Sequence, residues 1–247
     1  MQCDYFDAHV CRSCELMGQP YADQLDGLEA RARHTLGARV PPEAWEPVVA
    51  GPESGYRNKA KLVVGGRKGQ PTLGILDEAG QGVDLQRCGL YEPGLSAAIP
   101  VLAEVVAHAG LTPYDVPRRS GELKNLIVTH SPDDELMVRW VLRSEGQLPR
   151  VRQAVDALRE RLPMVRVATV NLLPEHVALL EGEREVVLTE AETLPMRVGE
   201  VTLHLGPRSF FQTNTAVATQ LYAAGRHWVS GLAPANAWDL YSGVGGF

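Results

Sequence analysis

The sequence has 247 residues, of which 45% are hydrophobic and 22% are charged, the balance of an ordinary globular protein with one large domain or two smaller ones. Its net charge of −6 at pH 7 excludes a protein that coats nucleic acid by overall charge alone, although a local basic surface remains compatible with it. No apolar run approaches the roughly 20 residues of a membrane span, and no signal peptide precedes the first cysteine. We therefore expect a cytoplasmic protein without a membrane partner.

The cysteines form the first motif of the chain. Cys3, Cys11 and Cys14 follow a C-x7-C-x2-C pattern, and Cys88 lies far beyond them. In a reducing cytosol, four thiolates that include one close pair suit a zinc ion or an iron–sulfur cluster better than disulfides. The spacing leaves zinc and iron–sulfur open, and independent buried cysteines are a third possibility. A nucleophilic Cys88 has little support, since no histidine is near it in sequence.

A helix and a basic, strand-rich block follow the cysteine segment. Apolar spacing predicts a helix over about 22–37, and prolines then mark a loop. The stretch 56–64 predicts a strand that points Ala60, Leu62 and Val64 to one face and Lys59 and Lys61 to the other. Residues 72–76 are its expected partner, through a turn at the glycines 65, 66 and 69.

The same block is a candidate RNA-binding surface. No acidic residue occurs between Ser54 and Leu76, whereas several lysines and arginines do. A basic two-stranded ribbon can lie along an RNA backbone, although a solvated strand face would produce the same charge pattern. The expected phosphate contacts are Arg57, Lys59, Lys61 and, from a second basic cluster, Lys124.

The middle of the chain alternates between helices and strands. Helices are predicted over 95–109 and 149–162 from their apolar periodicity. Strands are predicted over 123–130, 135–144, 165–172, 177–180, 186–189 and 197–205. Their short connections indicate mostly antiparallel pairing, hence an α+β fold.

The pattern changes towards the C-terminus. Asn214 is a good helix N-cap, and 215–230 predicts a helix with Val217, Leu221, Ala224 and Trp228 on one apolar stripe. Residues 237–241 predict a buried strand that runs into the sequence S-G-V-G-G-F. A strand followed by such glycines is typical of the opening of a nucleotide-binding α/β unit, although a glycine-rich end is the alternative.

The spacing in this glycine loop differs from the G-x-G-x-x-G pattern of dinucleotide sites, so S-adenosylmethionine (SAM) is favoured over NAD. A strand of this kind also requires parallel neighbours. None follows before Phe247, and we therefore expect the sequence to be the front part of a longer chain.

Several motifs together resemble one enzyme family. They are M-Q-C at the start, the C-x7-C-x2-C pattern, R-N-K-A at 57–60, G-E-L-K at 121–124, S-F-F-Q-T-N at 209–214 and D-L-Y-S-G-V-G-G-F at 239–247. The combination resembles the RNA 5-methyluridine methyltransferases along the whole chain. The resemblance implies a 4Fe-4S cluster on Cys3, Cys11, Cys14 and Cys88, and SAM contacts from Gln212, Tyr241, Gly243 and Gly245. From the residues alone, Gln212 is either a buried amide that binds a polar ligand or a hydrogen-bonding group near a helix N-terminus.

The resemblance also implies a function. It points to a SAM-dependent methyltransferase that forms 5-methyluridine in 23S ribosomal RNA, because the chain begins at the cysteines without a preceding RNA-binding domain. In this family a cysteine thiolate adds to C6 of uracil and a carboxylate removes the C5 proton. We expect both groups beyond Phe247, so that no catalytic residue lies in the sequence given. The alternatives are a non-catalytic, metal-stabilised RNA-binding module and a tRNA-directed uracil-C5 methyltransferase, which usually lacks the cysteines.

The expected organisation has three parts. Residues 1–90 would carry the iron–sulfur site and the basic strands, 91–206 a central α+β domain, and 207–247 the beginning of a Rossmann-like SAM domain. We expect a monomer that acts on RNA.

Overall fold

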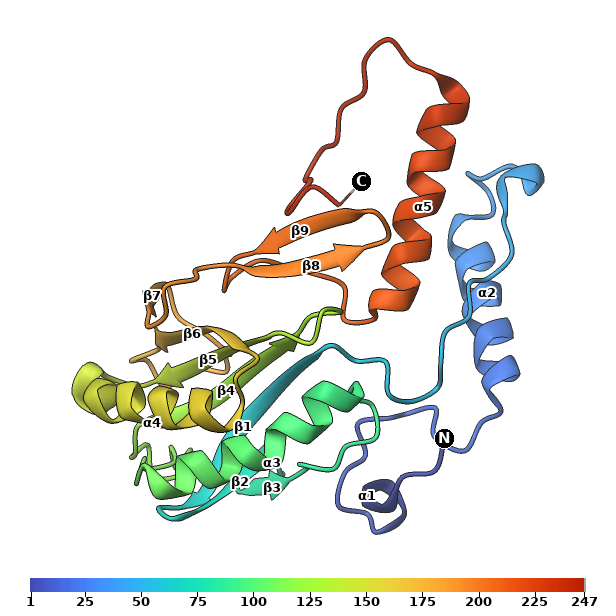
Figure 1. Cartoon of the computed structure of the whole chain (residues 1–247). Coiled ribbons are helices and arrows are strands. Elements are labelled where there is room, and N and C mark those ends of the chain that lie inside the picture. The colour runs from blue at the N-terminus through green and yellow to red at the C-terminus, as the bar shows by residue number, and fades with distance from the viewer. Residues whose placement is uncertain (247) are drawn as a thin grey trace.

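A seven-stranded sheet forms the centre of the computed structural model, which describes residues 1–246 (Figure 1). Its strands follow the spatial order β3-β2-β1-β4-β5-β6-β7, and all neighbours are antiparallel except β5 and β6. The mixed fold with a mostly antiparallel sheet confirms that part of the α+β prediction. The strands are β1 (Lys59–Arg67), β2 (Gln70–Leu76), β3 (Gly82–Asp84), β4 (Leu123–His130), β5 (Leu136–Leu142), β6 (Val165–Leu172) and β7 (Arg184–Val187).

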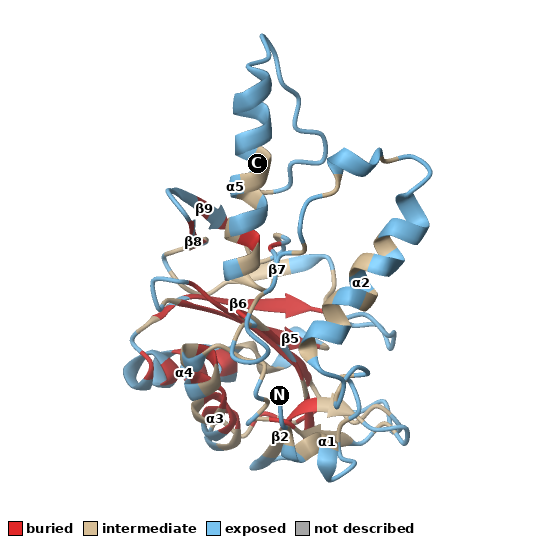
Figure 2. Cartoon of the chain, turned by 90° about the vertical axis from the view of Figure 1, so that its right-hand side faces the viewer, coloured by how far each residue is buried: buried red, intermediate tan, exposed pale blue. Residues whose placement is uncertain are grey.

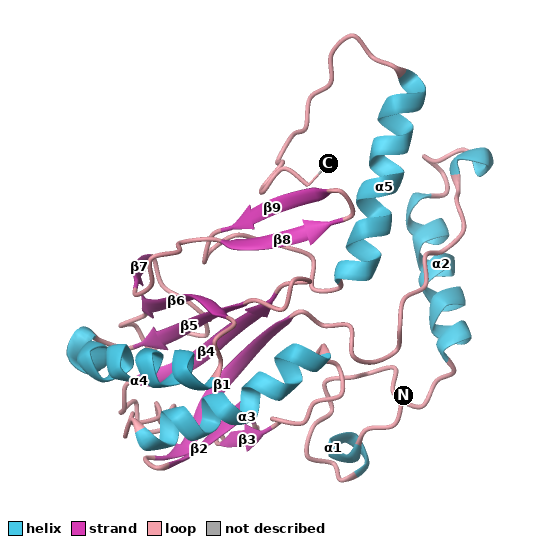
Figure 3. Ribbon diagram, in the orientation of Figure 1, coloured by secondary structure: helices cyan, strands magenta, loops and turns pink. Residues whose placement is uncertain are grey.

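Two helices cover one face of this sheet, as Figure 3 shows. They are α3 (Pro93–His108) and α4 (Leu148–Arg161), and they share the main hydrophobic core with β1, β2, β4, β5 and β6. The alternation predicted in β1 is confirmed: Ala60, Leu62 and Val64 are at most 1% exposed, whereas Lys61 is exposed. Each fully buried leucine or valine contributes roughly 1.5–3 kcal/mol to folding. Figure 2 shows the buried residues gathered in the strands and on the inner sides of α3 and α4.

The β1–β2 hairpin forms as predicted, but its turn lies further along the chain. Gly65 and Gly66 belong to β1, and Arg67 pairs with Gln70 across a two-residue turn. Gly69 has a φ of +80°, in the left-handed region that glycine tolerates. At Gly65 a side chain is excluded, because its Cβ would lie 2.5 Å from the Cα of Gly82. The glycines therefore serve close strand packing as well as the turn.

Two predicted strands differ in the structure. Residues 177–180 form a loop after β6 rather than a strand. The predicted strand over 197–205 is a hairpin of β8 (Leu194–Val198) and β9 (Val201–Leu205). Gly199, with a φ of +61°, allows the chain to reverse within two residues, which the continuous apolar pattern does not reveal.

Helix α5 (Thr215–Leu232) confirms the predicted helix and its cap, since the Asn214 side chain accepts a hydrogen bond from the amide of Val217. Its packing face differs from the predicted stripe. Ala218 is buried and Tyr222 packs with it against β8 and β9, whereas Trp228 is 52% exposed. The stripe prediction was therefore displaced by one position around the helix.

The predicted buried strand over 237–241 is absent from the structure. These residues form an irregular segment that returns towards β8 and β9 (Figure 1), and Trp238 is 86% exposed. No strand within residues 1–246 lies beside this segment to pair with it, and an extended segment is not stable without a hydrogen-bonding neighbour. Phe247, the last residue of the predicted loop, lies outside the described residues.

The N-terminal part consists of short helices joined by loops. Helix α1 (Asp4–Asp7) lies among the first three cysteines, α2 (Tyr21–Leu36) confirms the predicted helix, and a 3-10 turn occurs at Pro42–Ala44. A second 3-10 turn, at Glu145–Gln147, directly precedes α4 in the middle of the chain. Helix α2 contributes no residue to the buried core. Among residues 1–246, no helix combines the length and the hydropathy that a membrane span requires.

Candidate functional site

The four cysteines come from two distant segments that the fold brings together. The backbone amide of Arg87 donates to the Tyr5 hydroxyl at 3.2 Å, which ties the N-terminal segment to the loop that carries Cys88. Burial raises the pKa of the Cys14 thiol, and the charges of Cys11 and Cys3 raise it further. Burial also raises the pKa of Cys88, and the other three thiols add to the effect. The Tyr5–Arg87 hydrogen bond and these charge effects thus place Cys88 near the first three cysteines.

The cysteines nevertheless do not form a closed ligand set. All four are free thiols, and each is partly exposed. In the described part of the chain, no three histidine, cysteine or acidic side chains are arranged so that they could hold a metal ion. The structure therefore shows four neighbouring soft ligands but no preformed metal centre.

Of the predicted phosphate contacts, two are exposed and two are partly or fully buried. Arg57 and Lys61 are exposed, as a phosphate contact requires. Lys59 is partly buried, and burial together with the nearby positive charges of Arg139 and Lys61 lowers its pKa.

Lys124 departs from the prediction. It is 7% exposed, and its Nζ donates to the backbone carbonyl oxygen of Glu175 at 2.6 Å and lies 4.7 Å from the centre of the Tyr114 ring. Its ammonium group holds a loop in place and is not free for phosphate. The charge pattern of the sequence did not reveal this, because the loop that covers Lys124 is 51 residues away along the chain.

The segment 209–214 lies against the end of the sheet. Phe211 is buried with the β8–β9 hairpin, whereas the neighbouring Phe210 is 74% exposed. The Gln212 side chain is exposed, so of the two alternatives the buried amide does not occur in this structure. Its backbone is held instead: the carbonyl oxygen of Gln212 accepts a hydrogen bond from the Asn58 side chain at 3.0 Å.

The glycine loop is a series of turns that folds back onto α5. Gly243 and Gly245 have φ values of +59° and +72°, which side-chain-bearing residues rarely adopt. Val244 packs with the β8–β9 core, and a Cβ on Gly246 would meet the ring of Tyr222 at 2.5 Å. Tyr241 is fully exposed. Gln212, Tyr241, Gly243 and Gly245 are therefore accessible from solvent.

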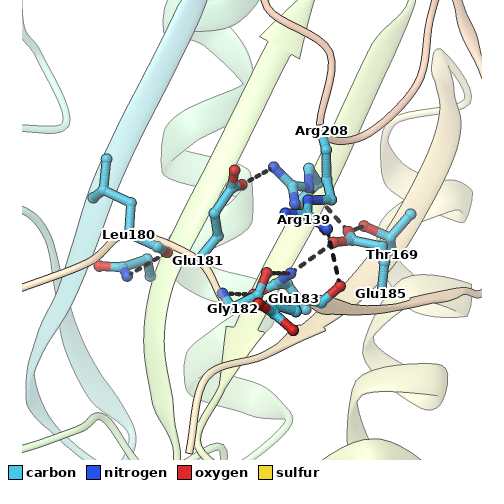
Figure 4. Close-up of polar contacts among 10 residues, drawn as sticks. Arg139, Thr169, Leu180, Glu181, Gly182, Glu183, Glu185 and Arg208 are labelled. Carbon is cyan, nitrogen blue, oxygen red and sulfur yellow. Dashed lines mark hydrogen bonds and ion pairs between the residues drawn. The ribbon is translucent and has the colours of Figure 1, made fainter. Parts of the chain in front are cut away.

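A buried polar network on the sheet was not predicted (Figure 4). Arg139 on β5 is only 2% exposed and donates to both carboxylate oxygens of Glu185, at 3.0 and 2.7 Å, and to Glu181 at 2.5 Å. Burial raises the pKa of Glu185, but hydrogen bonds from Arg139, Thr169 and Asn171 outweigh burial and leave the pKa below its usual value. The network lies on the sheet face opposite α3 and α4.

This network fixes the loop 173–183 over the sheet. Asn125 donates to the carbonyl oxygen of Leu180 at 3.1 Å, and Asn171 exchanges two hydrogen bonds with Gly182. Arg208 donates to the carbonyl oxygen of Glu183 at 3.1 Å. The signal that could have indicated this second buried face is a set of polar residues on one side of three strands: Asn125 and Thr129 on β4, Arg139 on β5, and Thr169 and Asn171 on β6.

The chain is similar along its whole length to known RNA methyltransferases. It is 47% identical over 248 aligned residues to the 23S rRNA (uracil(747)-C(5))-methyltransferase RlmC of Halothiobacillus neapolitanus, and the match covers 100% of this chain and 65% of the relative. The relative of the same name from Escherichia coli O139:H28 is also 47% identical, with 100% and 66% covered. The chain thus spans about 65% of the length of these relatives. No family model matches the sequence.

A solved structure shares the fold. The Pyrococcus abyssi tRNA (uracil-54, C5)-methyltransferase in complex with S-adenosyl-L-homocysteine superposes with a TM-score of 0.69 and 23% identity, over 88% of this chain and 50% of that one. At this identity the likeness concerns the fold. The identity to the RlmC proteins is 47% and extends over the whole chain, so this likeness concerns the sequence as well as the fold. Over its whole length the chain is therefore similar to RNA uracil-C5 methyltransferases.

Proposed function

We propose that the protein is part of a SAM-dependent methyltransferase that forms 5-methyluridine in 23S ribosomal RNA. The observation that carries this proposal is the 47% identity over the whole chain to proteins named for that reaction. The chain spans about 65% of their length, so the proposal concerns a protein as long as these relatives. We also propose that it acts as a monomer in the cytoplasm.

The proposed SAM site consists of Gln212, Tyr241, Gly243 and Gly245. The accessible Gln212 amide can donate and accept hydrogen bonds, and the left-handed backbone of the two glycines leaves room for close approach of a ligand. When bound, SAM supplies the methyl group. Replacing Gln212 with alanine in the full-length protein should weaken SAM binding, measured by calorimetry, by about tenfold for one lost polar contact. Unchanged affinity would remove Gln212 from the site.

We propose that Cys3, Cys11, Cys14 and Cys88 hold a 4Fe-4S cluster. Four soft ligands from two segments suit such a cluster, and the charges of Cys14, Cys3 and Cys11, which help to raise the pKa of Cys88, support their proximity. The cluster would then join the first 14 residues to the loop before α3.

The proposed RNA surface contains Arg57, Lys59 and Lys61. Arg57 and Lys61 are exposed, whereas Lys59 is partly buried and the negative charge of Glu181 acts on it. Lys124 is omitted, because its ammonium group is already bonded inside the fold. The target uracil would have to leave its stack, since C5 and C6 are inaccessible to a nucleophile inside paired RNA.

The test is methyl transfer by the full-length purified protein. With labelled SAM, 23S ribosomal RNA should acquire label that nuclease digestion and mass spectrometry identify as 5-methyluridine. Unfractionated tRNA is the matched control substrate. Label in tRNA alone would favour the tRNA-directed alternative, and no label in either RNA, from protein that binds RNA, would favour the non-catalytic RNA-binding module.

A further inference from the structure

The pair Arg57 and Asn58, just before β1, lies where three segments of the chain meet. The amide of Arg57 donates to the carbonyl oxygen of Leu90 at 2.8 Å, and the amide of Glu92 returns a bond to the Arg57 carbonyl oxygen at 3.1 Å. The carbonyl oxygen of Asn58 accepts from the amide of His130 at 2.8 Å. The position is therefore fixed on one side by the loop after Cys88 and on the other by the end of β4.

From this fixed position, Asn58 holds the segment 212–215. Its side-chain Nδ2 donates to the carbonyl oxygen of Gln212 at 3.0 Å and to the hydroxyl of Thr215 at 2.8 Å. Its backbone amide donates to the carbonyl oxygen of Thr213 at 2.9 Å. One residue that is 1% exposed thus makes three hydrogen bonds to three of four consecutive residues.

The segment that Asn58 holds is the one from which Gln212 projects. Asn214, the next residue but one, caps α5, so the backbone of 212–215 is fixed at both sides while the Gln212 side chain stays exposed. A polar contact to a ligand is effective only when its residue is held within about 0.5 Å of the productive position. The hydrogen bonds from Asn58 restrain the backbone without using the Gln212 side chain itself.

We propose that Asn58 is a positioning residue that fixes the backbone of Gln212–Thr215 and thereby sets the direction of the Gln212 amide. The identity of the ligand as SAM rests on the proposed function, whereas the hold on the segment does not. Asn58 itself would not touch the ligand. Its loss would loosen the segment and weaken SAM binding without removing any ligand contact.

Asn125 offers a matched control. It is another buried asparagine, 6% exposed, on β4 of the same sheet, and its Nδ2 donates to a backbone carbonyl oxygen, that of Leu180, at 3.1 Å. Aspartate has nearly the shape of asparagine but lacks the two N–H donors. Asn58→Asp and Asn125→Asp therefore each remove the N–H donors of a buried side chain. Only Asn58 bonds to Gln212.

The experiment measures hydrogen exchange in the 247-residue chain and SAM affinity in the full-length protein. Asn58→Asp should speed exchange in peptides covering 209–218 and lower SAM affinity by about tenfold. Asn125→Asp should speed exchange near 180 and leave SAM affinity within about twofold of the wild type. Equal exchange at 209–218 in the wild type and Asn58→Asp would overturn the proposal, as would equal SAM affinity.

A milder variant decides the matter if Asn58→Asp does not fold. Thr215→Val removes only the hydroxyl that accepts from Asn58, and should raise exchange at 209–218 and lower SAM affinity two- to fivefold. No change in exchange would overturn the proposal here too. If the full-length wild type binds no SAM, the proposed function fails, and the exchange measurements still decide whether Asn58 holds the segment.

Discussion

Arg139 shows how a single buried charge organises the uncovered face of the sheet. Replacing it with methionine would leave Glu185, whose side chain is 13% exposed, without its cation. Removing one partner of a buried ion pair costs about 3–5 kcal/mol, because the remaining charge stays desolvated. We expect a loss of that size in the free energy of unfolding, measured by urea denaturation.

The control for Arg139 is Arg118→Met. Arg118 pairs with Asp115 at 3.3 Å, and its side chain is 82% exposed. An exposed pair contributes about 0–1 kcal/mol, so this variant should unfold at nearly the wild-type urea concentration. Equal losses in the two variants would contradict the role given to burial.

His130 predicts a pH dependence of stability. Its two ring nitrogens lie 2.9 Å from Glu92 and 2.9 Å from Asp134, and the hydrogen bond to Glu92, followed by that to Asp134, outweighs burial and raises the pKa of His130 above 6.5. A raised folded pKa gives stability that is fully present below about pH 6.5 and is lost as pH rises through the folded value. The difference in unfolding free energy between wild type and His130→Gln should therefore shrink from pH 6 to pH 8. A difference that grows with pH would contradict this account.

At the scale of the elements, the sequence predicted structure best where neighbouring residues alone decide it, as at a helix cap or along an alternating strand. The Asn214 cap began α5 at the expected residue, and the alternation around Leu62 identified the inner face of β1. Prediction failed where a distant segment decides the outcome. All eight residues of β4 are buried, because helices cover one face and the loop 173–183 lies over the other, so Lys124 is enclosed in spite of its charge.

The candidate site was predictable in its chemistry but not in its geometry. The spacing of Cys11 and Cys14 indicated a shared site, and the fold does bring Cys88 towards them. The exposure of Gln212 could not be read from the sequence, because its neighbours in the fold are distant in the chain: Asn58, which donates to its carbonyl oxygen, is 154 residues away. Likewise, an apolar run such as 237–241 becomes a strand only beside another strand, and periodicity carries no information about that partner.

The cap of α5 can be tested by itself. Asn214→Ala removes the acceptor for the Val217 amide at 3.1 Å. Loss of such a cap costs about 1 kcal/mol, so we expect faster hydrogen exchange in the first turn of α5 and a small drop in thermal midpoint. Asn236→Ala, in the exposed segment after α5, serves as the control and should change neither.

At the scale of the whole molecule, the proposed cluster would connect the N-terminal segment to the sheet. The division into 1–90, 91–206 and 207–247 stays a prediction; β1 and β4, on either side of residue 90, pair in one sheet. Anaerobically purified protein should be brown and contain about four iron atoms and four sulfides per chain. Cys88→Ser should lose most of that iron, whereas stoichiometric zinc without iron would contradict the cluster.

The most direct test of the central claim is the 5-methyluridine content of 23S ribosomal RNA in cells that carry or lack the gene. Mass spectrometry of nuclease fragments would identify the modified uridine. We predict that one 5-methyluridine disappears from 23S ribosomal RNA on deletion and returns with the restored gene, while tRNA modification stays constant. An unchanged 23S pattern, or loss of the modification from tRNA instead, would contradict the assignment.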